Sequence, residues 1–110
     1  MSKYKKGAFL NVLNFNPTEW EAQLRQIKNL PSRQHIEVWL EYIPTKDELQ
    51  ILRGMLEETE VIVHGPFIHM SLVTHLNELA DVSWRRCYDA VDVATLIGAK
   101  VITFHAGTYA

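Results

Sequence analysis

The feature that most constrains this chain is a regular alternation of short apolar runs with amphipathic segments. Four runs rich in β-branched and aromatic residues predict strands at residues 7–15, 35–43, 60–67 and 100–105. The segments between them place apolar residues three or four positions apart, which is the spacing of one helix face. An order in which each strand is followed by a helix leads to parallel strands joined by right-handed crossovers.

The first two predicted helices have recognisable ends. The first begins at Asn16 and Pro17, a capping residue followed by proline at the first helical position, and it ends at Pro31. The second begins with Thr45 and Glu48 at the spacing of a capping box. Both signals place a helix between strands.

The third predicted helix follows a long connection at residues 68–82, which we expect to hold a helical turn of its own near residues 72–79. Asp81 or Ser83 is the expected cap, and Gly98 stands where a glycine commonly ends a helix. This helix completes the alternation.

We therefore predict an α/β domain with a parallel sheet of four strands and three main crossover helices. The runs at 61–63 and 101–104 are continuously apolar, which favours strands covered on both faces. Two architectures remain, a four-stranded open sheet or a piece of a (β/α)8 barrel. The chain has no glycine-rich nucleotide-binding motif of the kind common in open sheets.

Composition excludes several classes of function. With 110 residues and a formal net charge of -2, the chain predicts one domain with no general attraction to nucleic acid or anionic membrane. No run approaches the ~20 apolar residues of a membrane span. Cys87 is the only cysteine, so no intrachain disulfide forms and a cytoplasmic location is expected. We expect Cys87, Trp20 and Trp84 to pack in the interior.

Histidines follow the last two predicted strands, where parallel α/β folds collect their functional groups. His64 precedes Gly-Pro and His105 precedes Ala-Gly. Neighbouring strands lie about 4.8 Å apart, so His64 and His105 can converge to bind a metal or an oxygen-rich substrate. His69 and His75 in the following connection would lie over the same site, whereas His35 begins a strand at the opposite end.

Two acids on the second predicted strand complete the candidate set. Glu37 and Glu41 share one face by the two-residue period of a strand. An acid inside a parallel sheet is costly unless it is paired or bound. Glu41, nearer the carboxyl end, could therefore reach the site, while Glu37 could have a buried partner or touch substrate.

Three segments of the chain resemble the xylose isomerase-like TIM-barrel superfamily, which includes sugar-phosphate isomerases and epimerases and nucleases of the endonuclease IV type. Val-Ile-Val-His-Gly-Pro-Phe at 61–67 resembles the family's His-Ala-Pro-aromatic turn after the third strand. Residues 94–107 resemble its A-x-x-L-G-A-x-x-V-x-x-H-x-G run, and Ile-Glu-Val at 36–38 resembles its acidic second strand.

The resemblance implies roles for two histidines. In the nuclease branch, histidines at the positions of His64 and His105 bind zinc. In the isomerase and epimerase branch they more often line the substrate pocket, and the metal ligands lie on later strands. Gly65 replaces the usual alanine, Ala106 the usual proline, and Phe67 a tyrosine of the nucleases.

The leading hypothesis is a single partial domain, residues 1–110, equivalent to the N-terminal half of a (β/α)8 barrel. The parent activity would be metal-dependent isomerisation or epimerisation of a sugar, sugar phosphate or polyol, with zinc, manganese or magnesium. The metal site would be incomplete in this chain, which alone would be inactive. His64, His105, Glu41, Glu37 and His69 are the expected substrate-binding residues, and His64 and His105 the metal ligands.

Two alternatives remain open. An apurinic-site nuclease would need basic loops facing DNA, but residues 68–82 contain no lysine or arginine and carry Glu78 and Asp81. A non-enzymatic half-barrel would expose its first and fourth strands as sheet edges, which favour pairing. That alternative predicts a homodimer or another association that covers the edges.

Overall fold

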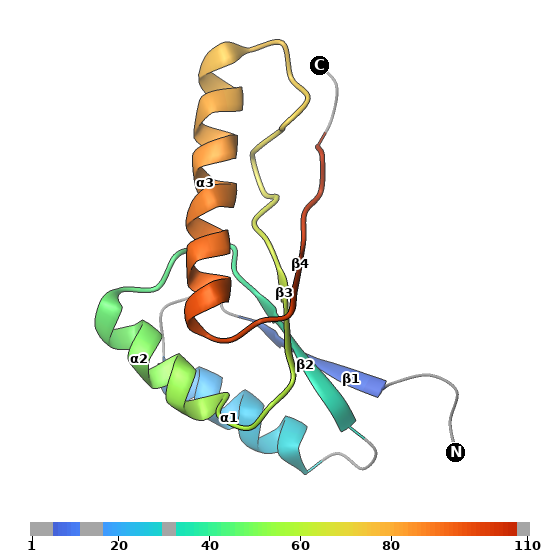
Figure 1. Ribbon diagram of the computed structural model, residues 1–110, viewed down its shortest axis with the longest axis vertical. Helices are drawn as coiled ribbons and strands as arrows, with labels where there is room; N and C mark the ends of the chain where they lie inside the picture. Colours follow the sequence, from blue (N-terminus) through green and yellow to red (C-terminus); the bar gives the residue numbers. More distant parts are fainter. Residues whose placement is uncertain (1–5, 12–16, 30–32, 108–110) are drawn as a thin grey trace.

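The computed structural model describes residues 6–11, 17–29 and 33–107, and it contains a parallel sheet with helices between the strands (Figure 1). The elements in chain order are β1 (Lys6–Asn11), α1 (Pro17–Lys28), β2 (Arg33–Trp39), α2 (Lys46–Met55), β3 (Val61–His64), α3 (Asn77–Leu96) and β4 (Val101–Thr103). The strands lie side by side in the order β1-β2-β3-β4, and each neighbouring pair is parallel.

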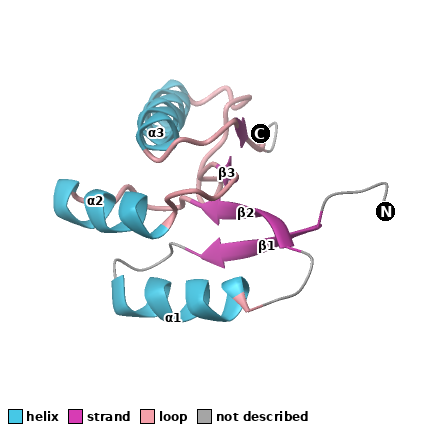
Figure 2. Ribbon diagram, turned by 60° about the horizontal axis from the view of Figure 1, so that its bottom comes forward, coloured by secondary structure: helices cyan, strands magenta, loops and turns pink. Residues whose placement is uncertain are grey.

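The three helices cover one face of the sheet (Figure 2). Ile36 and Val38 of β2 and Val61 and Val63 of β3 are buried in one apolar cluster with residues of α1, α2 and α3. The alternate positions on β3, Ile62 and His64, are only partly buried. The prediction that continuous apolar runs mark a sheet covered on both faces is therefore wrong, because the crossovers place every helix on the same side.

Several local signals read from the sequence are confirmed. The hydroxyl of Thr45 accepts from the Glu48 backbone N–H at 3.3 Å, and the Glu48 carboxylate accepts from the Thr45 N–H at 2.9 Å. α1 begins at Pro17 as predicted, while its expected cap Asn16 lies outside the described residues. Gly98 has a φ of 76° just after α3, a conformation that glycine adopts without strain.

The predicted start of the third helix is wrong. α3 begins at Asn77, and neither Asp81 nor Ser83 caps it, because both lie within the helix. The expected separate turn at 72–79 overlaps the first turn of this single long helix. Ser83 is instead fully buried and accepts a hydrogen bond from the Ser71 backbone N–H at 2.9 Å, which ties the preceding connection to α3.

The predicted fold, a four-stranded N-terminal half of a (β/α)8 barrel, was also wrong. β1, β2 and β3 form the body of the sheet, and β4 adds only three residues at its edge. Two outward side chains of β4 are exposed, with Val101 at 56%. The structure is a small α/β domain in which three helices pack on this sheet.

Local chemistry explains why the strands end earlier than predicted. Pro66 has no N–H to donate to a strand ladder, so β3 stops at His64. The ring of Phe104 crosses so close to Gly65 that a Cβ there would lie 2.5 Å from it. β2 ends at Trp39, and Glu41 beyond it turns into the interior.

The predicted interior residues are confirmed in part. Trp20 is fully buried and Cys87 is 5% exposed. Trp84, predicted to pack between helix and sheet, is 47% exposed on α3. None of the described helices combines the length and apolar character that crossing a membrane requires.

Candidate functional site

Two histidines meet at the carboxyl ends of β3 and β4. His64 is the last residue of β3 and pairs in register with Thr103, and His105 follows two residues later. The Nε2 atoms of the two rings are 2.8 Å apart. The convergence that the strand ends predict is therefore present.

One hydrogen bond of His64 identifies which ring nitrogen donates. Its Nδ1 lies 2.8 Å from the carbonyl oxygen of Gly65, which can only accept, so Nδ1 carries a proton. In the neutral ring the Nε2 of His64 then presents a lone pair, which can accept from the Nε2–H of His105. A histidine whose Nδ1 is held by a backbone carbonyl has the usual orientation of a metal ligand.

The pair alone supplies two nitrogen ligands. Within the described part of the chain, no group of three or more histidine, cysteine or acidic side chains could hold a metal ion. A divalent ion bound here would therefore need substrate or solvent oxygens to complete its coordination.

Aromatic rings surround the histidine pair. Phe67 stacks on Trp39 with centroids 5.3 Å apart and on His105 at 4.7 Å. His64 contacts Phe67 edge-on at 5.2 Å. Trp39 was not among the residues predicted for the site. Its position two residues after Glu37 on a strand, facing the same side, was the available signal.

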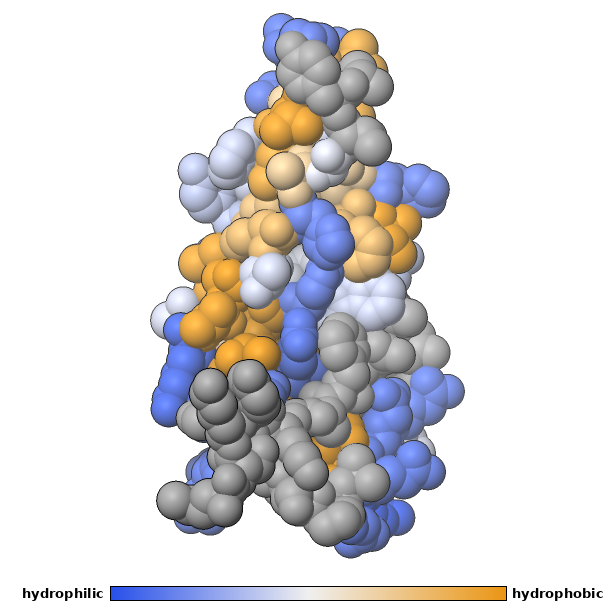
Figure 3. Space-filling model, turned by 90° about the vertical axis from the view of Figure 1, so that its right-hand side faces the viewer, coloured by the Kyte–Doolittle hydropathy of each residue, from blue (hydrophilic) through white to orange (hydrophobic). Residues whose placement is uncertain are grey.

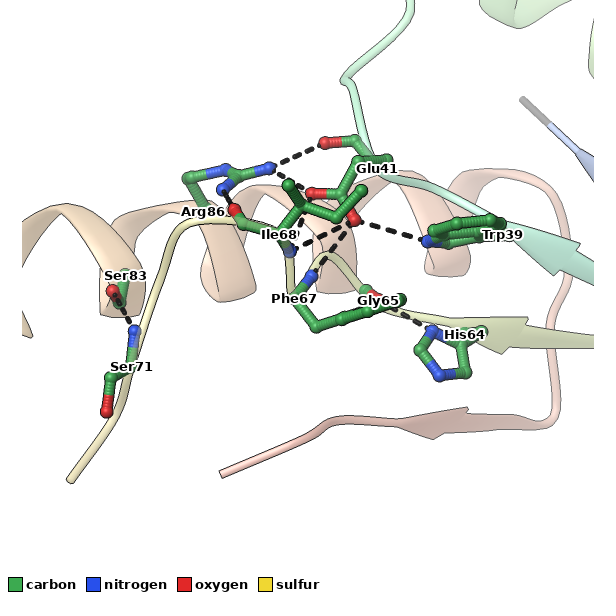
Figure 4. Close-up of polar contacts among 9 residues, drawn as sticks. All are labelled: Trp39, Glu41, His64, Gly65, Phe67, Ile68, Ser71, Ser83 and Arg86. Atoms are coloured by element: carbon green, nitrogen blue, oxygen red, sulfur yellow. Dashed lines mark hydrogen bonds and ion pairs between the residues drawn. The ribbon is translucent and has the colours of Figure 1, made fainter. Parts of the chain in front are cut away.

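Glu41, a predicted substrate ligand, is instead committed to protein partners (Figure 4). Its carboxylate accepts from the backbone N–H groups of Phe67 and Ile68 at 3.1 and 3.2 Å and from the indole of Trp39 at 3.3 Å. The residue is only 2% exposed. The geometry therefore assigns Glu41 to holding the turn after β3 and not to contacting substrate.

Arg86 of α3 neutralises this buried acid (Figure 4). Its guanidinium pairs with the Glu41 carboxylate and donates to the carbonyl oxygens of Glu41 and Ile68, both at 2.8 Å. Arg86 was not predicted from the sequence. A buried carboxylate needs a cation or several donors, and Arg86 stands beside Cys87, which is predicted to face the interior.

A pocket of about 880 Å³ lies beside His105. Its walls come from the connection after β3 and from residues 105–107. These two segments run side by side beyond the strands (Figure 1), and the Leu72 N–H donates to the Ala106 carbonyl at 2.8 Å. Gly107, with a φ of 94°, approaches Ser71 so closely that a Cβ would lie 2.7 Å from its Cα.

The other predicted site residues are dispersed. His69 lines the pocket and is exposed, with a φ of 56°. Glu37 is half-buried and pairs with Ile62 of β3. Because Ile62 precedes His64 by two residues, Glu37 lies on the same open face of the sheet as His64. His75 and His35 are not among the described residues that line the pocket.

Comparisons of this chain with family models, with curated proteins and with solved structures found no significant match. Membership of the isomerase-like superfamily therefore stays a prediction. Any function must be inferred from the side chains of the site itself.

Proposed function

We propose that this protein binds a divalent metal ion and an oxygen-rich small molecule, a sugar or related polyol, at the His64–His105 pair. The observation that supports this most directly is the facing of the two Nε2 atoms at 2.8 Å, with the other nitrogen of His64 held by a backbone carbonyl. The adjoining pocket provides space for the small molecule.

The reaction class that the resemblance implies is isomerisation or epimerisation, in which a base takes a proton from a carbon next to a carbonyl and returns it to a carbon of the same molecule. A bound divalent ion supplies polarisation of the carbonyl and hydroxyl oxygens. His64 and His105 would hold the ion through their Nε2 atoms once the proton between them is released, and a third group would then have to act as the base. The aromatic rings of Trp39 and Phe67 contact the two imidazoles.

Metal titration tests the proposal. Isothermal titration with Zn²⁺, Mn²⁺ and Mg²⁺ should detect binding to the wild type. His64→Ala and His105→Ala should each weaken it by at least about tenfold, since even changes around a ligand weaken metal binding that much. His35→Gln is the control, because His35 lies near the start of β2, at the other end of the sheet. Equal affinity in all four proteins would contradict the proposal.

A second candidate function is self-association, which is supported by exposed apolar side chains on α3 and β4. Trp84, Tyr88 and Val91 are exposed along one flank of α3, and Val101 is exposed on the edge strand β4. Val91 and Val101 line the same shallow groove. We infer that a second copy of this chain covers this surface, which we name the α3–β4 surface.

A further inference from the structure

We propose that the pocket beside His105 selects an uncharged, hydroxyl-bearing ligand, a free sugar or polyol, over its phosphorylated form. This inference rests on the proposed function and concerns the small molecule rather than the metal ion. The His64–His105 pair with its ion would accommodate either the free or the phosphorylated sugar. The choice between them depends on the walls of the pocket.

The described walls carry no lysine, arginine or acidic side chain. Their apolar side chains are Phe67, Met70, Leu76, Leu79 and Ala106. The hydroxyls of Ser71 and Thr74 also line it, but they already accept from the backbone N–H groups of Val73 and Leu76 at 3.3 and 3.2 Å. Imidazoles come from His69 and His105. Such a surface can cover the C–H face of a polyol, and its imidazoles can exchange hydrogen bonds with the ligand hydroxyls.

A phosphate group would lack compensation in this pocket. Recognition of a phosphate dianion normally uses arginine, lysine or a helix N-terminus. Arg86, which holds the turn at Ile68, directs its guanidinium to Glu41 and to the Ile68 carbonyl. Desolvating an unpaired phosphate would oppose binding.

The start of α3 does not replace a cation. Leu76, the residue before the helix, lines the pocket and is 59% exposed. The first turn of α3 carries Glu78. That carboxylate already complements the positive end of the helix dipole and repels a second anion.

The walls of the pocket are held in place by contacts within the protein. Ser71 is 4% exposed, and its N–H donates to the buried hydroxyl of Ser83. Gly107 lies against Ser71 at a distance that no other residue would allow. The two walls are thus fixed relative to each other before a ligand binds, which reduces the entropic cost of binding.

The test compares ribose with ribose 5-phosphate by saturation-transfer NMR on protein freed of metal by a chelator. Without metal, the phosphate cannot gain affinity through the ion. Ribose should receive saturation from the protein, and ribose 5-phosphate should bind at least about tenfold more weakly, a difference of about 1.4 kcal/mol. Equal or tighter binding of ribose 5-phosphate, or binding of neither compound, would overturn the inference.

An added cation should reverse the preference. Leu76→Arg places a guanidinium at the pocket rim and should strengthen binding of ribose 5-phosphate with little change for ribose. Leu96→Arg is the matched control, because it makes the same substitution at an exposed position of α3 outside both the pocket and the α3–β4 surface. Equal gains in the two variants would show that general electrostatics, and not the pocket, select the ligand.

The metal proposal and the pocket inference can be contradicted independently of each other. If the histidine variants leave metal binding unchanged while ribose binds as expected, the metal role is lost and the pocket preference stands. If metal binding depends on both histidines but the phosphate ester binds as well as ribose, the pocket inference alone is lost.

Discussion

Single residues decide the chemistry at the end of the sheet. The Nδ1 of His64 is held by a neighbouring carbonyl, so its Nε2 faces His105 in a defined orientation. Gly65 leaves room for the ring of Phe104, which a methyl group would displace. The glycine that departs from the resembled motif therefore has a steric reason in this structure.

Cys87 provides a pH-dependent prediction at the same scale. Burial raises the pKa of its thiol, and the nearby Arg86 opposes this shift without cancelling it. The folded state thus prefers the neutral thiol. Its contribution to stability is complete below the ordinary thiol pKa of about 8.5 and is lost as pH rises through the raised pKa.

We therefore expect the native thiol to react slowly with a maleimide or disulfide reagent at neutral pH and quickly after unfolding in urea. Cys87→Ala should lower stability at neutral pH by removing a buried side chain. The same variant should show a smaller loss of stability than the wild type between about pH 7 and about pH 10. Urea denaturation at both pH values measures this, and identical pH dependence would contradict the expectation.

At the scale of elements, the Glu41–Arg86 pair connects β2, the turn after β3 and α3. Glu41→Gln keeps the shape of the side chain but removes its charge and leaves Arg86 without a counterion. Breaking a buried ion pair in this way typically costs about 3 kcal/mol. We expect a loss of this size in the free energy of unfolding.

Chemical denaturation of Glu41→Gln and of Glu57→Gln measures that loss. Glu57 is an exposed acid after α2, so the same substitution there should change stability by less than about 0.5 kcal/mol. A difference between the two variants within experimental error would show that the pair does not stabilise the fold.

The sequence predicted those elements whose signals are local. Thr45 and Glu48 specify the start of α2, and Gly98 marks the end of α3, because each acts on the backbone within one helical turn. The start of α3 could not be read in this way. Its N-cap residue is Leu76, which makes no side-chain capping hydrogen bond, so no local capping signal marks this end.

The same distinction between local signals and long-range contacts explains which features of the site the sequence predicted. Strand ends located His64 and His105 correctly, because the carboxyl ends of neighbouring parallel strands meet at one edge. The burial of Glu41 among protein partners could not be predicted, since its partner Arg86 lies 45 residues away in the chain. The contact of Phe104 with Gly65, which lies just beyond the end of β4, is likewise a long-range contact that the sequence does not show.

At the scale of the whole molecule, the proposed self-association would use the α3–β4 surface. Figure 3 shows the side on which β4 lies, where apolar side chains flank a polar band. An exposed sheet edge with apolar neighbours favours association with another chain. We expect the wild type to form a dimer at micromolar concentration.

Sedimentation velocity tests this expectation. Val101→Lys, which puts a charge on the edge strand, should shift the protein to a monomer without unfolding it. Ile51→Lys makes a similar change on α2, where Ile51 is also exposed, and should leave the dimer intact. A wild-type protein that sediments as a folded monomer would rule out the proposed association.

The order of the strands in space, β1-β2-β3-β4, is the same as their order along the chain. Each strand therefore joins the free edge left by its predecessor, and none has to insert between two that are already paired. A growing polypeptide can thus add one strand and one helix at a time while it leaves the ribosome. The histidine pair, which joins residues 41 positions apart, forms in the last of these steps.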